Sequence, residues 1–70
     1  MIEDLRKLIR ATPFMPFTLY TTDGRAFRVP HPDHIFVYPS GLIGLEDDEG
    51  AVNLLPSLHL NGIEKRSRAS

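Results

Sequence analysis

An Asp-Gly pair between two β-rich runs is the feature that most constrains how this chain can fold. The segment FTLYTTDGRAFRVP, residues 17–30, has strand-forming side chains on both sides of Asp23 and Gly24. This pattern is typical of a β-hairpin, because glycine supplies the positive φ that a tight turn requires. The segment therefore predicts two antiparallel strands, at residues 17–22 and 25–30.

The alternation of side chains selects one register for this hairpin. A two-residue loop at residues 23–24 would place apolar and charged side chains together on both faces. A three-residue loop at residues 22–24, with Gly24 in the left-handed position of a G1 bulge, instead sets Leu19 opposite Phe27. A slip of one residue reverses both faces, so we predict the three-residue loop. The predicted buried face consists of Phe17, Leu19, Phe27 and Val29.

An amphipathic helix is expected before the hairpin, at residues 2–11. Its apolar stripe is formed by Ile2, Leu5, Leu8 and Ile9, and a helix this short is stable only when the stripe docks on other structure. Pro13 and Pro16 end the helix. Beyond the hairpin, we expect a proline corner at residues 30–33, strands at 34–38, 42–46, 51–55 and 60–65, and one helical turn or tight corner at 56–59.

These elements predict a mostly β chain of the α+β class. The N-terminal helix is followed by a five-stranded, strongly bent antiparallel sheet or a small SH3-like or Sm-like barrel, one end of which the helix would cap. Residues 1–66 form a single small domain in this prediction, and residues 67–70 form a disordered tail.

Size and charge narrow the classes of function. The chain has 70 residues, a formal net charge of -1 and no cysteine, which excludes disulfides and thiolate zinc sites. A core this small supplies about 3 to 5 kcal/mol, so self-association is the expected supplement. The weak net charge does not favour non-specific nucleic-acid binding.

The sequence has no run resembling a membrane span or a signal peptide, so we expect a cytoplasmic protein without membrane contact.

The order of elements resembles the Sm-like and broader SH3-like small barrels. Residues 58–64, LHLNGIE, are similar to the second Sm motif, with Leu60, Asn61 and Gly62 at its conserved places, whereas residues 32–34 do not reproduce the Asp and Asn pair of the first Sm motif. The pattern PFxPFTLYTxDGRxFxVPHPD after a helix also resembles a group of short uncharacterised bacterial proteins. That second resemblance implies a fold but no activity.

Three polar groups are candidates for chemistry, and each has a simpler structural interpretation. His31, Asp33 and His34 could supply metal ligands, but they are also ordinary residues of a proline corner. Ser57 and His59 could suggest a hydrolytic pair, although no third group orients them. The acidic run at residues 47–49 lacks the alternating ligands of a calcium loop and is interpreted as a solvated turn. We therefore predict no catalytic residue, no cofactor and no metal site.

Partner binding is the remaining class of function. The predicted contact residues are Tyr20, Arg28, His31 and Asn61; Arg25, Lys65 and Arg66 could add basic charge around Tyr20 and Arg28. Our prediction is a non-enzymatic β-barrel interaction module that forms homo-oligomers through an exposed strand edge and can bind a protein partner. The alternative is an Sm-like ring protein that binds RNA near Arg28, His31 and Asn61.

Overall fold

The computed structural model describes residues 1–65, so the predicted tail lies outside the described residues. Within them the chain forms one α-helix, two short 3-10 helices and six strands. Their bounds are α1 (Ile2–Arg10), β1 (Phe17–Thr21), β2 (Ala26–Val29), η1 (Pro32–His34), β3 (Ile35–Val37), β4 (Ile43–Glu46), β5 (Val52–Leu55), η2 (Ser57–His59) and β6 (Leu60–Lys65).

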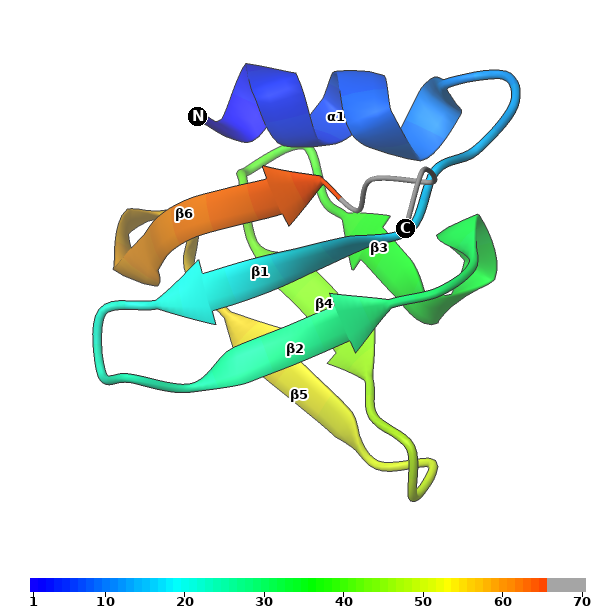
Figure 1. The fold of residues 1–70 in the computed structure, drawn as a ribbon. Coiled ribbons are helices and arrows are strands. Elements are labelled where there is room, and N and C mark those ends of the chain that lie inside the picture. Colours follow the sequence, from blue (N-terminus) through cyan, green and yellow to red (C-terminus); the bar gives the residue numbers. More distant parts are fainter. Residues whose placement is uncertain (66–70) are drawn as a thin grey trace.

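Two three-stranded antiparallel sheets pack against each other (Figure 1). Their strand orders are β2-β1-β6 and β3-β4-β5. The predicted α+β class with mostly β structure is confirmed, but the strands form two sheets instead of one five-stranded sheet, and these sheets do not close into a barrel within residues 1–65. The chain leaves the first sheet at Pro30 and enters the second after η1. Proline has no N–H to donate, so a continuous ladder is interrupted at this corner.

The predicted hairpin register is confirmed. Leu19 pairs with Phe27 and Phe17 pairs with Val29. Gly24 has a φ of +87°, and its N–H donates to the Thr21 carbonyl at 3.1 Å, as a G1 bulge requires. The Thr21 hydroxyl is buried and accepts the Arg25 N–H at 2.9 Å.

The other two hairpins of the described chain repeat this turn. The Tyr38 N–H donates to the Leu42 carbonyl at 2.8 Å, and the Asp47 N–H donates to the Ala51 carbonyl at 2.9 Å. Each three-residue loop ends on a glycine with positive φ, +96° at Gly41 and +84° at Gly50. The same backbone geometry therefore sets the register of β3 with β4 and of β4 with β5.

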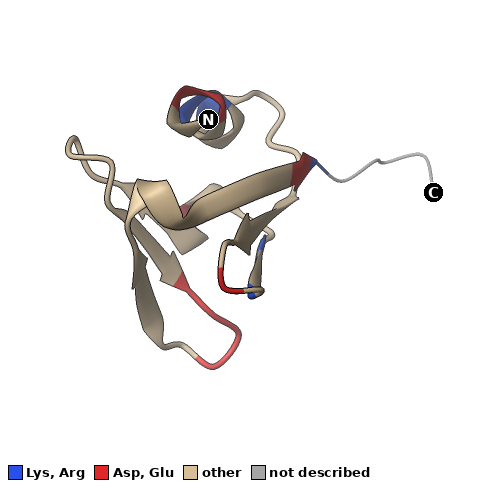
Figure 2. Ribbon diagram, turned by 90° about the vertical axis from the view of Figure 1, so that its left-hand side faces the viewer, with Lys and Arg blue, Asp and Glu red and all other residues tan. Residues whose placement is uncertain are grey.

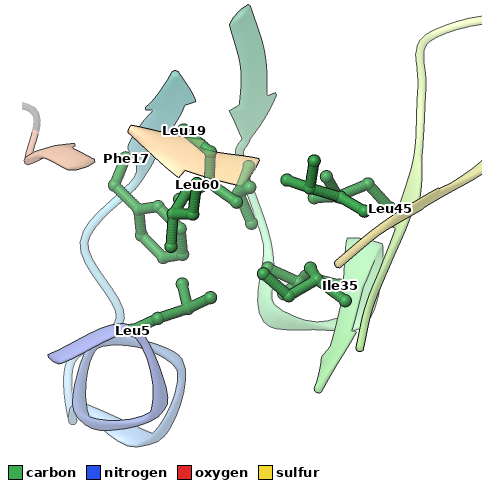
Figure 3. Packing of buried hydrophobic residues seen from close by; sticks show 9 residues of the cluster. Leu5, Phe17, Leu19, Ile35, Leu45 and Leu60 are labelled. Carbon is green, nitrogen blue, oxygen red and sulfur yellow. The ribbon is translucent and has the colours of Figure 1, made fainter. Parts of the chain in front are cut away.

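The core lies between the two sheets and α1 (Figure 3). Of the face predicted to be buried, Phe27 is only half-buried, because β2 is an edge strand. The Arg25 guanidinium covers that ring at 5.3 Å from its centroid. The buried apolar residues are Leu5, Phe17, Leu19, Val29, Ile35, Ile43, Leu45, Leu55 and Leu60.

Helix α1 ends at Arg10, one residue before its predicted end, and lies beside β6 at the edge of the β2-β1-β6 sheet (Figure 1). Leu5 is fully buried and points toward Phe17 and Leu60 (Figure 3). Ile2, Leu8 and Ile9 pack against the margin of the core. The helix thus docks on its own chain, which provides the support that a helix of nine residues needs.

Replacing Gly24 with valine is expected to lower the free energy of unfolding by about 1–2 kcal/mol, the cost of a side chain in the left-handed region. An added Cβ meets nothing within 4 Å, so the cost is conformational and not steric. Gly24→Asn should lose less, because asparagine tolerates this conformation. Urea denaturation measures both, and a valine variant as stable as the wild type would contradict the positive φ.

Truncating Leu5 to alanine is expected to unfold much of the population. Removing a buried leucine side chain costs about 2–5 kcal/mol, comparable to the whole stability expected of so small a core. Lys7→Ala changes an exposed residue of the same helix and serves as the control. Circular dichroism during thermal denaturation should separate the two variants, and equal melting temperatures would contradict the docked position of α1.

Candidate functional site

Tyr20 and Arg28 lie on the outer face of the β2-β1-β6 sheet, as the hairpin register requires. Tyr20 is flanked by Ala26 and Gly62, and its hydroxyl donates to Glu64 Oε1 at 2.6 Å. The hydrogen bond and the negative charge of Glu64 both raise the pKa of Tyr20 above its ordinary value. Tyr20 is therefore held against a carboxylate of its own sheet.

The other basic side chains expected beside Tyr20 lie elsewhere or outside the described residues. Arg25 forms an ion pair with Asp23 at 3.0 Å and stacks on Phe27. Lys65 pairs in register with Phe17, which places it on the opposite face of the sheet from Tyr20. Arg66 lies outside the described residues. Among residues 1–65, the expected basic and aromatic surface is thus reduced to Tyr20 and Arg28, with Glu64 on the same face.

Asn61 and His31 do not join this pair. Tyr20 pairs with Gly62 and Thr21 with Leu60, so Asn61 is the extra residue of a β-bulge in β6. Strands β6 and β2 flank β1 on opposite sides, which separates Asn61 from Arg28. His31 is exposed at the corner that follows β2. The four predicted contact residues therefore do not form one site.

The histidine cluster is compact, but its side chains do not converge. The rings of His31 and His34 are 5.9 Å apart between centroids, and Asp33 Oδ1 lies 4.0 Å from His34 Nε2. His34 belongs to η1 and not to the third strand, which begins at Ile35. In the described part of the chain, no group of three or more His, Asp or Glu side chains could hold a metal ion.

Ser57 and His59, the suggested hydrolytic pair, contact different parts of the chain. His59 Nδ1 lies 3.4 Å from the Thr22 hydroxyl. Ser57 lies beside Gly41, where an added Cβ would come within 3.0 Å of its hydroxyl oxygen. Each side chain thus contacts a different hairpin turn.

The acidic run at residues 47–49 forms the turn between β4 and β5 (Figure 2). Asp47 Oδ1 accepts the backbone N–H groups of Glu49 and Ala51 at 3.0 and 2.9 Å, and Oδ2 accepts the Asn53 side-chain amide at 3.2 Å. The Ala51 bond, followed by the Asn53 bond, lowers the pKa of Asp47. The hydrogen bonds of the Asp47 carboxylate therefore stabilise the turn.

The surface that sequence reasoning missed is the outer face of the β3-β4-β5 sheet. Phe36 is 58% exposed and Leu54 is 61% exposed, and both are opposite Gly44 across the ladder. Tyr38 packs edge-on against Phe36 at 4.7 Å between ring centroids. Val52, at 69% exposure, continues the surface toward the acidic turn. We call these four side chains, Phe36, Tyr38, Val52 and Leu54, the apolar face.

A shallow groove of about 400 Å³ runs over the apolar face. Gly44 lies between its two walls, Phe36 and Leu54. The ionisable side chains that line the groove are Asp33, His34 and Glu46, beside Tyr38. The arrangement offers an apolar surface with carboxylates at one end, which suits contact with another macromolecule.

Strand β5 also presents a free edge. Within residues 1–65 its ladder partner is β4, so its other side is unpaired. The Asp47–Ala51 bond sets the alternation of the ladder, which turns the backbone groups of Asn53 and Leu55 toward β4 and those of Val52 and Leu54 outward. The strand contains no charged residue and no proline, the features that usually protect an edge.

One signal in the sequence could have indicated this surface. In HIFVY and in VNLL, both of the alternating faces carry apolar residues, although an antiparallel sheet with one wet face has polar residues on that side. A strand with two apolar faces is typical of a sheet that is buried on both sides. Here the core buries the inner face, and no element within residues 1–65 buries the outer face.

Comparison with protein-family models, with curated proteins and with solved structures finds no match to this chain. None of the helices in residues 1–65 is both long enough and apolar enough to span a bilayer.

Stability is expected to fall in acid through Asp47. Its pKa in the folded chain is below the ordinary aspartate value of about 3.9, so the unfolded state binds the proton first. The contribution is complete above that value and is lost as the pH falls through the lower, folded pKa. Asp47→Asn should therefore flatten the dependence of unfolding free energy on pH in this range.

Urea denaturation at a series of pH values measures this effect. Asp48→Asn removes the same charge from the same turn but keeps the hydrogen bonds of Asp47, so it should retain the wild-type profile. An Asp47→Asn variant with an unchanged profile would show that the turn bonds do not stabilise the ionised form.

Proposed function

We propose that this protein is a non-enzymatic interaction module that self-associates by antiparallel pairing of β5 with β5 of a second copy. The observation that carries the proposal is the unprotected edge of β5, where Val52 and Leu54 are exposed and their backbone groups point outward. Unpaired, uncharged edges of this kind are templates for strand addition. A protein that keeps such an edge can use it for assembly.

The alternation of the β4–β5 ladder defines the register of the proposed pair. Only Val52 and Leu54 have outward backbone groups, so Val52 of each copy bonds to Leu54 of the other, with the two-fold axis at Asn53. About four interstrand hydrogen bonds form in this register. The side chains of Val52 and Leu54 are then direct cross-strand neighbours, a favourable apolar pair.

The other edges in the described chain are less suited to pairing. Strand β2 carries Arg28 and ends before Pro30, and β6 carries Glu64 and Lys65 after its bulge. Strand β3 is three residues long, and the Arg6 side chain donates to the Tyr38 carbonyl at 3.3 Å just beyond it. Strand β5 is the edge with the fewest obstacles.

We further propose that the fold is a distorted member of the SH3-like or Sm-like small barrels. This relation is supported by the pairing of β1 with β6 and by the helical turn η2 immediately before β6. In such a barrel, β2 and β3 would be one strongly bent strand interrupted at Pro30–His34, which restores the expected count of five.

The non-enzymatic assignment is supported by the roles of the polar side chains. Asp47 closes one turn, and Thr21, Asp23 and Arg25 stabilise another through mutual hydrogen bonds. The RNA-binding alternative has less support, because Glu64 occupies the face of Tyr20 and Arg28, and Asn61 lies across β1 from Arg28.

Val52→Pro is expected to weaken dimer formation about tenfold or more. Proline removes an outward N–H from the free edge but none from the β4 ladder, so the fold should persist. Arg28→Pro is the matched control, because the same alternation turns the Arg28 N–H toward the free edge of β2. Sedimentation equilibrium over a range of concentrations measures dimerisation, and circular dichroism checks the fold of both variants.

Two outcomes would contradict the proposal. Wild-type protein that stays monomeric at high micromolar concentration would refute self-association itself. A wild-type dimer that is weakened by Arg28→Pro and not by Val52→Pro would assign the interface to β2 instead.

A further inference from the structure

Gly44 occupies the middle of the β3-β4-β5 sheet, where a side chain would ordinarily be favoured. A Cβ at this position would meet Leu54 Cδ2 at 3.8 Å and the Phe36 carbonyl oxygen at 3.9 Å, both ordinary van der Waals distances. Its φ is not positive, unlike those of Gly24 and Gly41. Glycine in a strand interior lowers stability and often marks close approach of another group. Within residues 1–65, the Leu54 side chain approaches the outer side of Gly44 but leaves room for a Cβ, so it does not account for the glycine.

The part of the groove that lies over Gly44, which we call the hollow, has apolar side chains on both sides. Phe36 on β3 and Leu54 on β5 form its walls, and both are more than half exposed. Tyr38 braces the Phe36 ring from one side. An apolar side chain seated between these walls would bury the facing sides of Phe36 and Leu54, and such anchors dominate the energy of interfaces.

The charge around the hollow indicates the chemistry of its occupant. Asp33 and Glu46 line the groove, and the acidic turn continues from Glu46 through Asp48 and Glu49 (Figure 2). Carboxylates at this end favour lysine or arginine on the bound segment. They disfavour binding of the apolar face of a second copy, because that face carries the same carboxylates. Arg6 and Arg10 lie next to Phe36 at the β3 edge of the sheet. They would repel basic residues of a bound segment there, so those residues are placed over Glu46.

We propose that the apolar face binds a cationic, apolar peptide segment of a partner protein. One apolar side chain of the segment is seated over Gly44 between Phe36 and Leu54, and its basic residues lie against Glu46 and Asp33. Leu54 belongs to both surfaces, but the two interactions use different groups: edge pairing uses the outward backbone groups of β5, and the peptide contacts side chains above the plane of the sheet. Gly44 on β4 lies away from the free edge of β5, so a substitution there tests the peptide site without changing the backbone groups used in pairing.

The experiment uses a synthetic amphipathic helical peptide with leucine on one face and lysine on the other. A second peptide with glutamate in place of lysine tests the charge. Binding to the full chain is followed by fluorescence anisotropy and by amide chemical shifts. We expect the leucine–lysine peptide to bind, with the largest shifts at residues 36, 44 and 54, and the leucine–glutamate peptide to bind about tenfold or more weakly.

Gly44→Val fills the hollow and is expected to weaken binding of the lysine peptide about tenfold or more, while the melting temperature stays equal or rises. Gly62→Val is the matched control, because it adds the same side chain to the outer face of the other sheet, where a Cβ meets nothing within 4 Å. If Gly44→Val does not fold, Phe36→Ser replaces it, with exposed Leu58→Ser as its control.

Charge reversal gives an independent readout. Glu46→Lys should reverse the preference between the two peptides, whereas Glu64→Lys on the other sheet should not. The proposal is overturned if the lysine peptide does not bind the wild type, if both peptides bind equally, or if Gly44→Val binds like the wild type. Dimerisation of the Gly44→Val variant, measured in the same samples, reports on the β5 edge alone.

Discussion

Each hairpin in the described chain turns through a glycine with positive φ, at Gly24, Gly41 and Gly50. A one-residue slip at any of these turns would move the core side chains of a strand to its outer face. The glycine turns therefore do more than reverse the chain. They decide that Leu19, Ile43 and Leu55 lie in the core, and the packing of the two sheets and α1 depends on that choice.

The same register creates the surface to which we assign function. With Ile43 and Leu45 turned inward, Gly44 must face outward, and its ladder neighbours Phe36 and Leu54 must face outward with it. The apolar face is thus a direct consequence of the turn at Gly41 and the turn at Gly50. Exposing these side chains is unfavourable for an isolated domain, which is the physical reason to infer that something covers them.

The fold was more predictable than the site for a physical reason. Hairpin geometry is local, so the loop at residues 22–24 was sufficient to predict the pairing of Phe17 with Val29. The candidate site residues were chosen instead for their polar chemistry, and Tyr20 and Arg28 are neighbours, whereas Asn61 lies across β1 from Arg28. Distance across a sheet depends on strand order, which no local pattern in this sequence specifies.

By itself, the sequence determined the local elements of this protein: the amphipathic helix, the hairpin with Gly24 in its bulge, and the helical turn before β6. Each depends on residues close together in the chain, whose conformational preferences act locally. Only the tertiary structure decided that Phe36 is exposed and that Phe27, which the alternation places on the buried face, is half-buried. Burial depends on which sheet packs against which, and that choice belongs to the whole core.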